Sequence, residues 1–446
     1  MDDAAAAEPE PESRGDALRR SQTAKAAGLA LASMAANAVQ AIFVGAFAHI
    51  LGAASYGSLA RLVTAMVILN VPGIALQAAA AREVALGRLG HGMQLAAALA
   101  SWRRHLAFAF VALFVVSVLV RHQLAAIMSV DQEWAAATTL PMSMLWLFLS
   151  LERGVLSGLH AYRPVGLSIL GEAAVRLGSA LLLTLAGAGV TGAFLGLPIG
   201  WLAMSAALAV ALRHRVGAPE GAPLRTLTGL ITSAWAPLAA LTLVFVMQNL
   251  DVFMIPLYAT KKAAGAYAGA ATAAKVAIWV AVGIAVYLLP EAARRAAEGR
   301  DPRPALARAV GIVGAVALPV LLIFATVPDL LLRVALGPDF ERASSALLLL
   351  GLAMSLLALV NLGSQYMLAL FQYKFLYLLG AVVAVEPVLL ASAPAGLESF
   401  ASMVLLVQGV AAAGMLVLCV RIRTSAASHG PGAGLSPTAV ASGLQD

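Results

Sequence analysis

The sequence predicts an all-α integral membrane protein of about 12 transmembrane helices, and composition, apolar runs and charge placement lead to that fold class. Of the 446 residues, 61% are apolar and only 11% are charged, whereas soluble domains carry about 25% charged residues. So few charges cannot cover soluble domains, which excludes a soluble enzyme and a disordered chain. The one cysteine, Cys419, cannot form an internal disulfide, so a disulfide scaffold is also excluded.

Twelve apolar runs are long enough to cross a membrane as helices. A hydrocarbon core of about 30 Å requires about 20 apolar residues in a helix. Alternating apolar and polar residues, typical of barrel strands, are absent. The eleventh run is the least regular, because Pro387 and Pro394 interrupt it. The runs cover residues 24–50, 58–81, 105–121, 135–159, 164–186, 190–212, 229–258, 264–290, 305–327, 343–370, 376–395 and 399–420.

Basic residues predict the orientation, because Lys and Arg collect on the cytoplasmic side of membrane proteins. With the N-terminus in the cytoplasm, 21 of the 29 Lys and Arg lie on the cytoplasmic side, five outside and three within the runs. Arg103 and Arg153 are counted here among the cytoplasmic ones. This split predicts a multi-pass protein with both termini cytoplasmic. We interpret these residues as topology determinants and predict no nucleic-acid partner.

The domain boundaries follow from composition. Residues 1–23 hold six acids and three bases, so they resemble a disordered acidic cytoplasmic tail and not a signal peptide. Residues 213–228 form a polar, Pro- and Gly-containing cytoplasmic linker between six-helix bundles at 24–212 and 229–420. A second disordered cytoplasmic tail is predicted at 421–446. The segment 82–104 mixes apolar and basic residues, which favours an interfacial helix over a plain loop.

The two halves show a weak internal repeat. The segment Leu51–Gly57 aligns with Ala259–Gly265 at an offset of 208, although chance similarity between Ala-rich stretches is an alternative. Two six-helix halves have the same orientation, so the repeat is parallel, with a pseudo-two-fold axis along the membrane normal. Such repeats are typical of transporters that work by alternating access, with the substrate site near mid-membrane.

Three charged residues within the runs are candidate site residues, because a charge there costs about 2.5–3.5 kcal/mol and faces the bundle interior or a wet cavity. Glu172 and Arg176 are four residues apart, share one helix face and can pair. They either lock helices together as an ion pair or line a substrate path. Asp251, in the seventh run, either makes a helix–helix hydrogen bond or binds a cation or proton.

Lys275 is the sharpest single candidate, because it lies in the middle of the eighth run with no carboxylate within one turn. Tyr267, Lys275 and Trp279 share one stripe, which offers a cation and aromatic faces to a phosphorylated sugar. The alternative is that Lys275 pairs with an acid on another helix. Arg61 begins the second run near the outer surface and is expected to snorkel to the interface.

Amide side chains accompany these charges in stripes along three runs. Interhelical hydrogen bonding explains many such residues, but three stripes near the start of the halves suggest a hydrated central cleft. Glu386, beside Pro387, is either a further site residue or a helix-terminal group. The paired amides are Asn37 with Gln40, Asn70 with Gln77, and Asn361 with Gln365.

Catalytic and cofactor motifs are missing from the sequence. It contains no zinc-protease, nucleotide-binding, serine-hydrolase or paired-cysteine motif. The seven histidines are scattered. We therefore expect a transporter and not an enzyme, with no metal and no cofactor. Because no ATP-binding loop is present, transport driven directly by ATP is disfavoured, and coupling to a cation or proton gradient is the expected alternative.

Several segments resemble one family. Leu151–Tyr162 followed by Glu172 and Arg176 resembles the fourth-to-fifth-helix signature of the Wzx-like polysaccharide and oligosaccharide flippases, which belong to the multidrug/oligosaccharidyl-lipid/polysaccharide (MOP) exporter superfamily. Further matches are Gly52–Gly57, Asn249–Asp251 with Gly265–Tyr267, and Leu336–Phe340. Together they cover about residues 24–420.

The resemblance implies a MATE-like fold of two six-helix bundles around a central cavity. It implies translocation of a lipid-linked oligosaccharide, carried on a polyprenyl pyrophosphate, across the bacterial inner membrane for O-antigen, lipopolysaccharide, capsule or similar polymers. Glu172, Arg176 and Asp251 match charged positions of the family pattern. Membrane lipids, a polysaccharide polymerase and glycosyltransferases are the expected partners.

Two other functions are alternatives. A MATE-type multidrug or cation antiporter uses carboxylates in its bundles, and the first run here has none. A membrane glycan polymerase or ligase needs a large external loop, whereas the longest predicted here are only 122–134 and 328–342. The lipid II flippase branch of the family typically has fourteen spans and a more basic cavity, so it fits less well.

Overall fold

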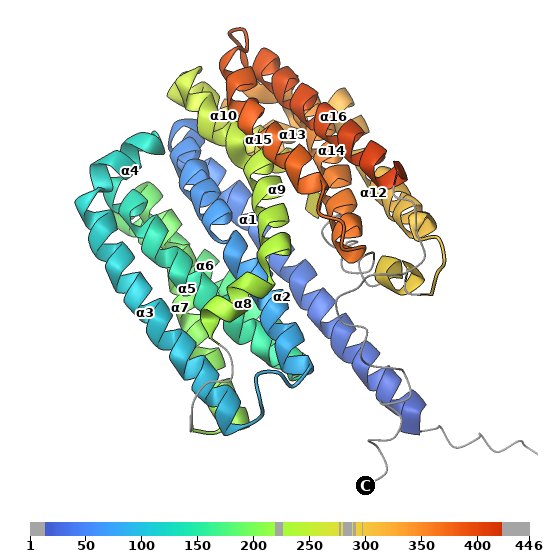
Figure 1. The fold of residues 1–446 in the computed structure, drawn as a ribbon. Coiled ribbons are helices and arrows are strands. Elements are labelled where there is room, and N and C mark those ends of the chain that lie inside the picture. The colour runs from blue at the N-terminus through green and yellow to red at the C-terminus, as the bar shows by residue number, and fades with distance from the viewer. Residues whose placement is uncertain are drawn as a thin grey trace, which may run out of the picture. The chain divides into compact units, whose positions relative to one another are not determined.

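The structure is a computed structural model that describes residues 14–218, 226–275, 278–279, 288, 291–296 and 298–421. These residues form helices and turns with no strand among them, which confirms the all-α prediction (Figure 1). They divide into two compact units, one up to Ala270 with Asp329–Ser344, the other Ala271–Pro328 with the chain from Ser345. This division does not fall at the expected linker, 213–228. The two six-helix halves stay a prediction.

The first unit begins with two crossings joined without a loop. α1 (Arg14–Leu69) has 56 residues, or about 84 Å at 1.5 Å per residue, far more than one bilayer crossing requires. Gly52 divides it, because its φ of 69° lies in the left-handed region that favours glycine. α2 (Val71–Ala85) then begins with a proline in its first turn. α1 is already helical over 14–23, where a disordered tail is predicted, and residues 1–13 lie outside the described residues.

The next long helices are α3 (Met93–Leu119) and α5 (Glu133–Gly158), which pack together, with the short α4 (Arg121–Ile127) between them in the chain (Figure 1). α3 begins at Met93 and not at residue 105, so the predicted interfacial helix over 82–104 is wrong. The error arose because Arg103 and Arg104 interrupt the apolar pattern inside α3.

α6 (Tyr162–Leu183) and α7 (Gly189–Val216) form the closest helix pair of the first unit. They are joined by a short π-helical segment, η1 (Thr184–Ala188), in which Gly187 has φ 96°. Gly192, Gly196 and Gly200 lie four residues apart on α7 and face the α6 backbone; a Cβ at Gly196 would lie 2.6 Å from the Arg176 carbonyl oxygen. Small residues at this spacing let two helix backbones approach closely.

Glycines also allow close packing between α2 and α5. A Cβ added at Gly158 would lie 2.5 Å from the Ala81 carbonyl oxygen, and one at Gly154 would collide with the Gln77 carbonyl oxygen. Because the glycines are four residues apart, they share one face of α5. The two glycine-lined contacts fix α5 and α7 against their neighbours, and α5 also contacts α7.

The first unit also includes segments from later in the chain. α7 continues to Val216, inside the predicted linker, residues 219–225 lie outside the described residues, and α8 (Leu227–Ser233) follows. α9 (Trp235–Met254), η2 (Ile255–Leu257) and α10 (Lys261–Ala274) come next, and α9 contacts α1 and α2. α13 (Pro328–Leu336) and η3 (Pro338–Ala343) return to this unit, where the Phe340 and Tyr56 rings are 5.4 Å apart.

The second unit contains α12 (Arg303–Thr326), α14 (Ser344–Ala369), α15 (Phe375–Ala391) and α16 (Leu397–Arg421). Here too, glycines mark close contacts. A Cβ at Gly351 of α14 would lie 2.6 Å from the Phe324 ring of α12, and one at Gly414 of α16 would lie 2.9 Å from Leu378 of α15. Of the predicted tail 421–446, only Arg421 is among the described residues.

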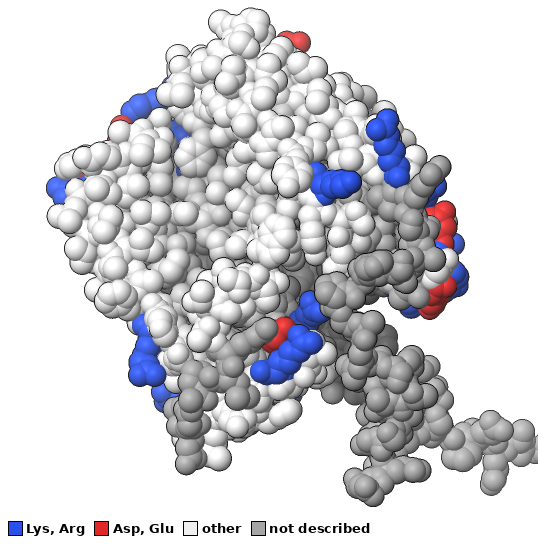
Figure 2. Space-filling model, in the orientation of Figure 1, with Lys and Arg blue, Asp and Glu red and all other residues white. Residues whose placement is uncertain are grey.

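The described helices support the predicted number of crossings. Eight are long and apolar enough to span a membrane, and two of these, Leu31–Ala85 and Tyr162–Val216, have 55 residues each, the length of two crossings. The shorter apolar helix Phe375–Ala391 corresponds to the eleventh run. The predicted eighth run, 264–290, lies partly outside the described residues. On the face drawn in Figure 2, uncharged side chains dominate and charges form small groups, as a lipid-facing surface requires.

Candidate functional site

The candidate site lies in the first unit, on the face of α6 that points toward the other helices. Leu167, Ala174, Gly178 and Leu182 are exposed and form one stripe along α6. At 100° per residue, Glu172 and Arg176 lie on the opposite side of the helix. Their side chains therefore point into the bundle, as a charged residue in a membrane helix requires.

Glu172 is held by two other helices. Its Oε2 accepts a hydrogen bond from the Arg153 Nη2 of α5 at 2.8 Å, and its Oε1 accepts one from the Trp201 Nε1 of α7 at 3.0 Å. The predicted pairing of Glu172 with Arg176 does not occur. Glu172 does form an ion pair that holds helices together, which was one of the two interpretations, but its partner is Arg153.

Arg153 lies deep in the unit, with only 4% of its surface exposed. Besides Glu172, it donates from Nε to the Ser168 hydroxyl at 2.9 Å and from Nη2 to the Ser168 carbonyl oxygen at 3.0 Å. Its guanidinium carbon is 5.8 Å from the centre of the Trp146 ring. The planar fork of donors on arginine suits such multiple contacts. Arg153 is thus a structural bridge from α5 to α6.

A second buried carboxylate lies next to Arg153 in the sequence. Glu152, 1% exposed, accepts a hydrogen bond from the Arg103 Nη2 of α3 at 2.8 Å and one from the Ser205 hydroxyl of α7 at 2.7 Å. Together the two pairs connect α3, α5, α6 and α7. Buried carboxylates are stable only where their oxygens are satisfied in this way.

Arg176 differs from these arginines, because no described carboxylate pairs with it. Its guanidinium carbon lies 5.5 Å from the centre of the Phe43 ring of α1, and its buried Nε has no hydrogen-bond partner among the described residues. The other two arginines of this cluster, Arg103 and Arg153, each pair with one carboxylate. Arg176 therefore leaves one uncompensated positive charge in this cluster, where the low dielectric strengthens its attraction for an anion.

Asp251 of α9, another predicted site residue, is fully buried and accepts a hydrogen bond from the Tyr267 hydroxyl of α10 at 3.0 Å. Tyr267 is thereby directed toward Asp251, whereas Lys275 and Trp279 of the same predicted stripe belong to the second unit. Lys275 is mostly buried in the turn that follows α10, and Trp279 is 38% exposed. The structure thus brings Asp251 together with Tyr267.

Arg61 does not snorkel. It is 3% exposed and donates from Nη2 to the Ser129 carbonyl oxygen at 2.9 Å and to the Ser58 hydroxyl at 3.2 Å. Arg61 therefore holds the loop between α4 and α5. The same loop carries Asp131, which pairs with Lys261 of α10 at 2.7 Å.

The predicted amides do not form a common cluster among the described residues. Asn37 of α1 is exposed, Gln40 and Gln77 are half-buried, and the carbonyl oxygen of Asn70 accepts a hydrogen bond from the Trp146 Nε1 at 2.9 Å. Through Trp146, Asn70 contacts the charged cluster. The remaining three predicted residues, on α14 and α15 of the second unit, are Asn361 and Glu386, both buried, and Gln365, half-buried.

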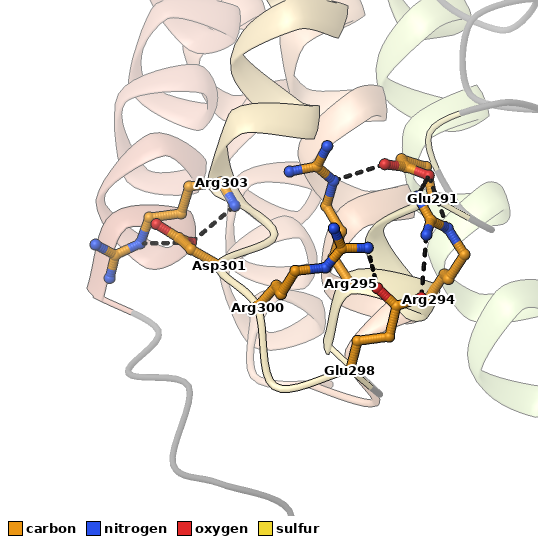
Figure 3. A network of polar contacts seen from close by, with 7 residues as sticks. All are labelled: Glu291, Arg294, Arg295, Glu298, Arg300, Asp301 and Arg303. Atoms are coloured by element: carbon orange, nitrogen blue, oxygen red, sulfur yellow. Dashed lines mark hydrogen bonds and ion pairs between the residues drawn. The ribbon is translucent and has the colours of Figure 1, made fainter.

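The second unit also carries a network of ion pairs next to α12 (Figure 3). Glu291 binds Arg294 at 2.8 Å and Arg295 at 2.6 Å, and Arg294 also binds Glu298 at 3.0 Å. The hydrogen bond from Arg295, and then that from Arg294, hold the pKa of Glu291 below its ordinary value. Most of these charges pair with one another, as is typical of an exposed ion-pair network.

Sequence reasoning missed three members of the charged cluster: Arg103, Glu152 and Arg153. The sequence analysis treated the two arginines only as topology determinants, because hydropathy does not show the partner of a charged residue. One signal was available. Glu152 and Arg153 lie within the apolar run 135–159, and in the middle of a segment that resembles the flippase signature.

Comparisons with known proteins show a likeness in one part of the sequence and in the fold. Residues 167–345, which include α6 with Glu172 and Arg176, match the family model described as polysaccharide biosynthesis protein. No curated protein matches the sequence. Among solved structures, the lipid II flippase MurJ in an inward closed conformation is similar with a TM-score of 0.71 and 11% identity, over 87% of each chain.

Two further structures come from the same superfamily. An inward-facing multidrug resistance MATE family transporter has a TM-score of 0.63 and 15% identity, over 87% of this chain and 94% of that one. A MOP superfamily transporter from Pyrococcus furiosus has a TM-score of 0.61 and 15% identity, over 89% and 94%. The chain therefore has the fold of the MOP-superfamily membrane transporters. The match over residues 167–345 supports the predicted resemblance to a polysaccharide biosynthesis family.

Proposed function

We propose that this protein is a flippase that moves a lipid-linked oligosaccharide across the bacterial inner membrane for the synthesis of a surface polysaccharide. The observation that carries the proposal is Arg176. This arginine is an uncompensated cation on an inward-facing helix surface, in the part of the chain that matches the polysaccharide biosynthesis family. Because the similar structures quoted above are transporters or flippases, a non-enzymatic role is supported.

In the proposed mechanism, Arg176 attracts the pyrophosphate of a polyprenyl carrier or an acidic sugar. Arginine suits this task, because its fork of donors matches phosphate oxygens and its charge is permanent. As further proposals, Lys275 contacts a phosphate and the amides and Trp279 contact the glycan, while the lipid tail stays in the bilayer. Alternating access then exposes the site to each side in turn. A proton or cation gradient drives the cycle, with Asp251 as the coupling carboxylate.

The test is transport by an Arg176→Ala variant. We expect it to accumulate the lipid-linked unit inside cells and to lose at least tenfold of the surface polymer. We also expect it to lose flipping of a fluorescent polyprenyl-pyrophosphate glycan in proteoliposomes. The matched control is Arg163→Ala, an exposed arginine at the start of the same helix. Normal polymer and flipping in Arg176→Ala at normal expression contradict the role of Arg176.

The same proteoliposomes separate the proposed function from its rival. A MATE-type antiporter exports an organic cation against a proton or sodium gradient and does not move the glycolipid. Gradient-driven export of a cationic dye without glycolipid flipping by the unmodified protein contradicts the proposed function.

A further inference from the structure

We propose that Arg153 is a positioning residue that keeps Arg176 available for an anionic ligand by occupying Glu172. The inference rests on the proposed function only in taking Arg176 as the ligand-binding cation. It assigns to Arg153 a role beyond determining the membrane orientation and beyond holding α5 and α6 together. The argument depends on which of two arginines Glu172 binds.

By sequence alone, Arg176 is the natural partner of Glu172. The two are four residues apart with the acid nearer the N-terminus, which is the favourable order for an ion pair on one helix. Such a pair would neutralise Arg176 and remove its attraction for a phosphate. In the structure Arg153 takes this place, with its Nη2 2.8 Å from the Glu172 Oε2. The uncompensated cation of the cluster is consequently Arg176.

Two features of the structure make Arg153 the stronger partner. The first is preorganisation, because two hydrogen bonds to Ser168 fix the guanidinium before it meets Glu172. The second is that the remaining carboxylate oxygen, Oε1, is bound by Trp201. Each carboxylate oxygen is therefore held by a donor from another helix, Arg153 of α5 or Trp201 of α7, and this anchors Glu172 toward these two residues.

The close contact of α6 and α7 places Trp201 where it is needed. A Cβ at the neighbouring Gly200 would lie 3.0 Å from the carbonyl oxygen of Glu172 and 3.5 Å from the Cβ of Arg176. Glycine at this position allows α7 to approach α6 directly beside the two charged side chains. Meanwhile the guanidinium of Arg176 is turned toward Phe43 of α1.

Removal of Arg153 alone has a definite consequence. Glu172 loses its cation while still buried among helices, which is strongly unfavourable. The cation on the same face of its own helix is Arg176, so Glu172 is expected to turn to it. Both an Arg153→Met variant and an Arg176→Ala variant should then lose the ligand, although for different reasons.

The experiment measures binding of farnesyl pyrophosphate, a short polyprenyl pyrophosphate, to the purified full-length protein by calorimetry, with farnesol as the uncharged probe. We expect Arg153→Met to bind farnesyl pyrophosphate at least about tenfold more weakly than the unmodified protein. The double variant Arg153→Met/Glu172→Gln should recover to within about threefold, because no carboxylate is left to neutralise Arg176. Arg163→Met serves as the matched control, and farnesol binding should not change.

The double variant also covers the case in which Arg153→Met does not fold, because it removes both charges of the pair together. A folded double variant that binds farnesyl pyrophosphate as weakly as Arg176→Ala overturns the proposal. Unchanged binding by folded Arg153→Met also overturns it. A structure of Arg153→Met is expected to show Glu172 within about 4 Å of Arg176, the distance of an ion pair. A Glu172 side chain that stays away from Arg176 contradicts the proposal without reference to any ligand.

Failure of the proposed function gives a different pattern. If the unmodified protein and Arg176→Ala bind farnesyl pyrophosphate equally, Arg176 is not the ligand-binding cation and the proposed function loses its support. If Arg176→Ala loses binding but the double variant does not recover it, only the role of Arg153 is wrong.

Discussion

At the scale of single residues, the first unit shows two ways in which an arginine is accommodated among membrane helices. Arg153 is fully engaged by Ser168 and Glu172, whereas Arg176 contacts an aromatic ring and pairs with no described carboxylate. A charge near the centre of a membrane helix costs about 2.5–3.5 kcal/mol. The paired arginine is explained by the fold. The unpaired one requires another reason, and the anion binding proposed above would supply it.

The sequence predicted correctly on which helix face Glu172 and Arg176 lie, but it did not predict the residues that Glu172 binds. The sequence shows that Glu172 and Arg176 share a helix face and point inward, because that depends only on helical periodicity. It cannot show that Glu172 binds Arg153 and Trp201, because those contacts join three helices. Arg61 is a similar case, since its partner is the Ser129 carbonyl oxygen, 68 residues away in the chain.

The network at Glu291 makes a prediction about pH (Figure 3). Arg295 and Arg294 lower the pKa of Glu291 in the folded protein below its ordinary value of 4.5. A depressed carboxylate pKa contributes stability that is complete above the unfolded value and is lost as the pH falls through the folded one. We therefore expect the melting temperature of the unmodified protein to exceed that of Glu291→Gln at pH 7, with the difference shrinking below pH 4.5.

The control for this measurement is Glu398→Gln, which removes an exposed carboxylate that makes no ion pair with the described residues. Its melting temperature should follow that of the unmodified protein at every pH. A difference between Glu291→Gln and the unmodified protein that grows on acidification would contradict the direction assigned to the Glu291 pKa.

At the scale of elements, glycines on helix faces determine which helices pack closely. Gly154 and Gly158 of α5 face α2, while Gly196 and Gly200 of α7 face α6. These glycines are helical, so they serve close packing and not a special backbone conformation. Gly52 is different, because its positive φ divides α1 into two crossings. The sequence predicts the helices themselves well, since apolar runs of about 20 residues are required to cross a bilayer.

The contact of α6 with α7 is tested by Gly196→Leu. The added side chain would meet the Arg176 carbonyl oxygen and Ala180 at distances that real side chains do not adopt, so the helices must separate. We expect a loss of about 1–3 kcal/mol in the free energy of unfolding, as overpacking typically causes. The melting temperature in detergent should fall accordingly.

Gly311→Leu on α12 provides the matched control, because a Cβ at Gly311 would meet no atom within 4 Å. This variant should melt at or slightly above the temperature of the unmodified protein, since leucine favours helix more than glycine does. Equal melting temperatures for Gly196→Leu and Gly311→Leu would show that the α6–α7 contact does not depend on glycine.

At the scale of the whole molecule, the fold is that of the MOP-superfamily transporters, recognised over 87% of the chain in spite of 11% identity to the lipid II flippase. Such conservation of fold with little sequence identity is expected where the bilayer constrains the structure strongly. The substrate does not follow from the fold, because multidrug transporters and flippases share it. The orientation in the membrane stays a prediction of the basic residues.

The predicted orientation is tested by cysteine labelling. Cys419 is buried and is the single cysteine, so Cys419→Ala gives a cysteine-free background. In intact cells, a membrane-impermeant maleimide should label Lys262→Cys, which is exposed on the predicted outer side, and should not label Arg213→Cys until the membrane is opened. If Arg213→Cys is labelled in intact cells and Lys262→Cys is not, the orientation is the opposite of the predicted one.

The amino-acid sequence was enough to predict an integral membrane protein, its membrane helices and the inward face of α6. Each of these depends on local properties: apolar length, helical periodicity and the cost of charge in lipid. Which charges pair with one another became clear from the packed helices. Pairing of a carboxylate depends on its distance to arginines of several helices and not on spacing along one helix. Glu172 pairs with Arg153, although Arg176 is nearer in the sequence. Arg176 is left without a carboxylate partner, and this is the basis of the proposed function.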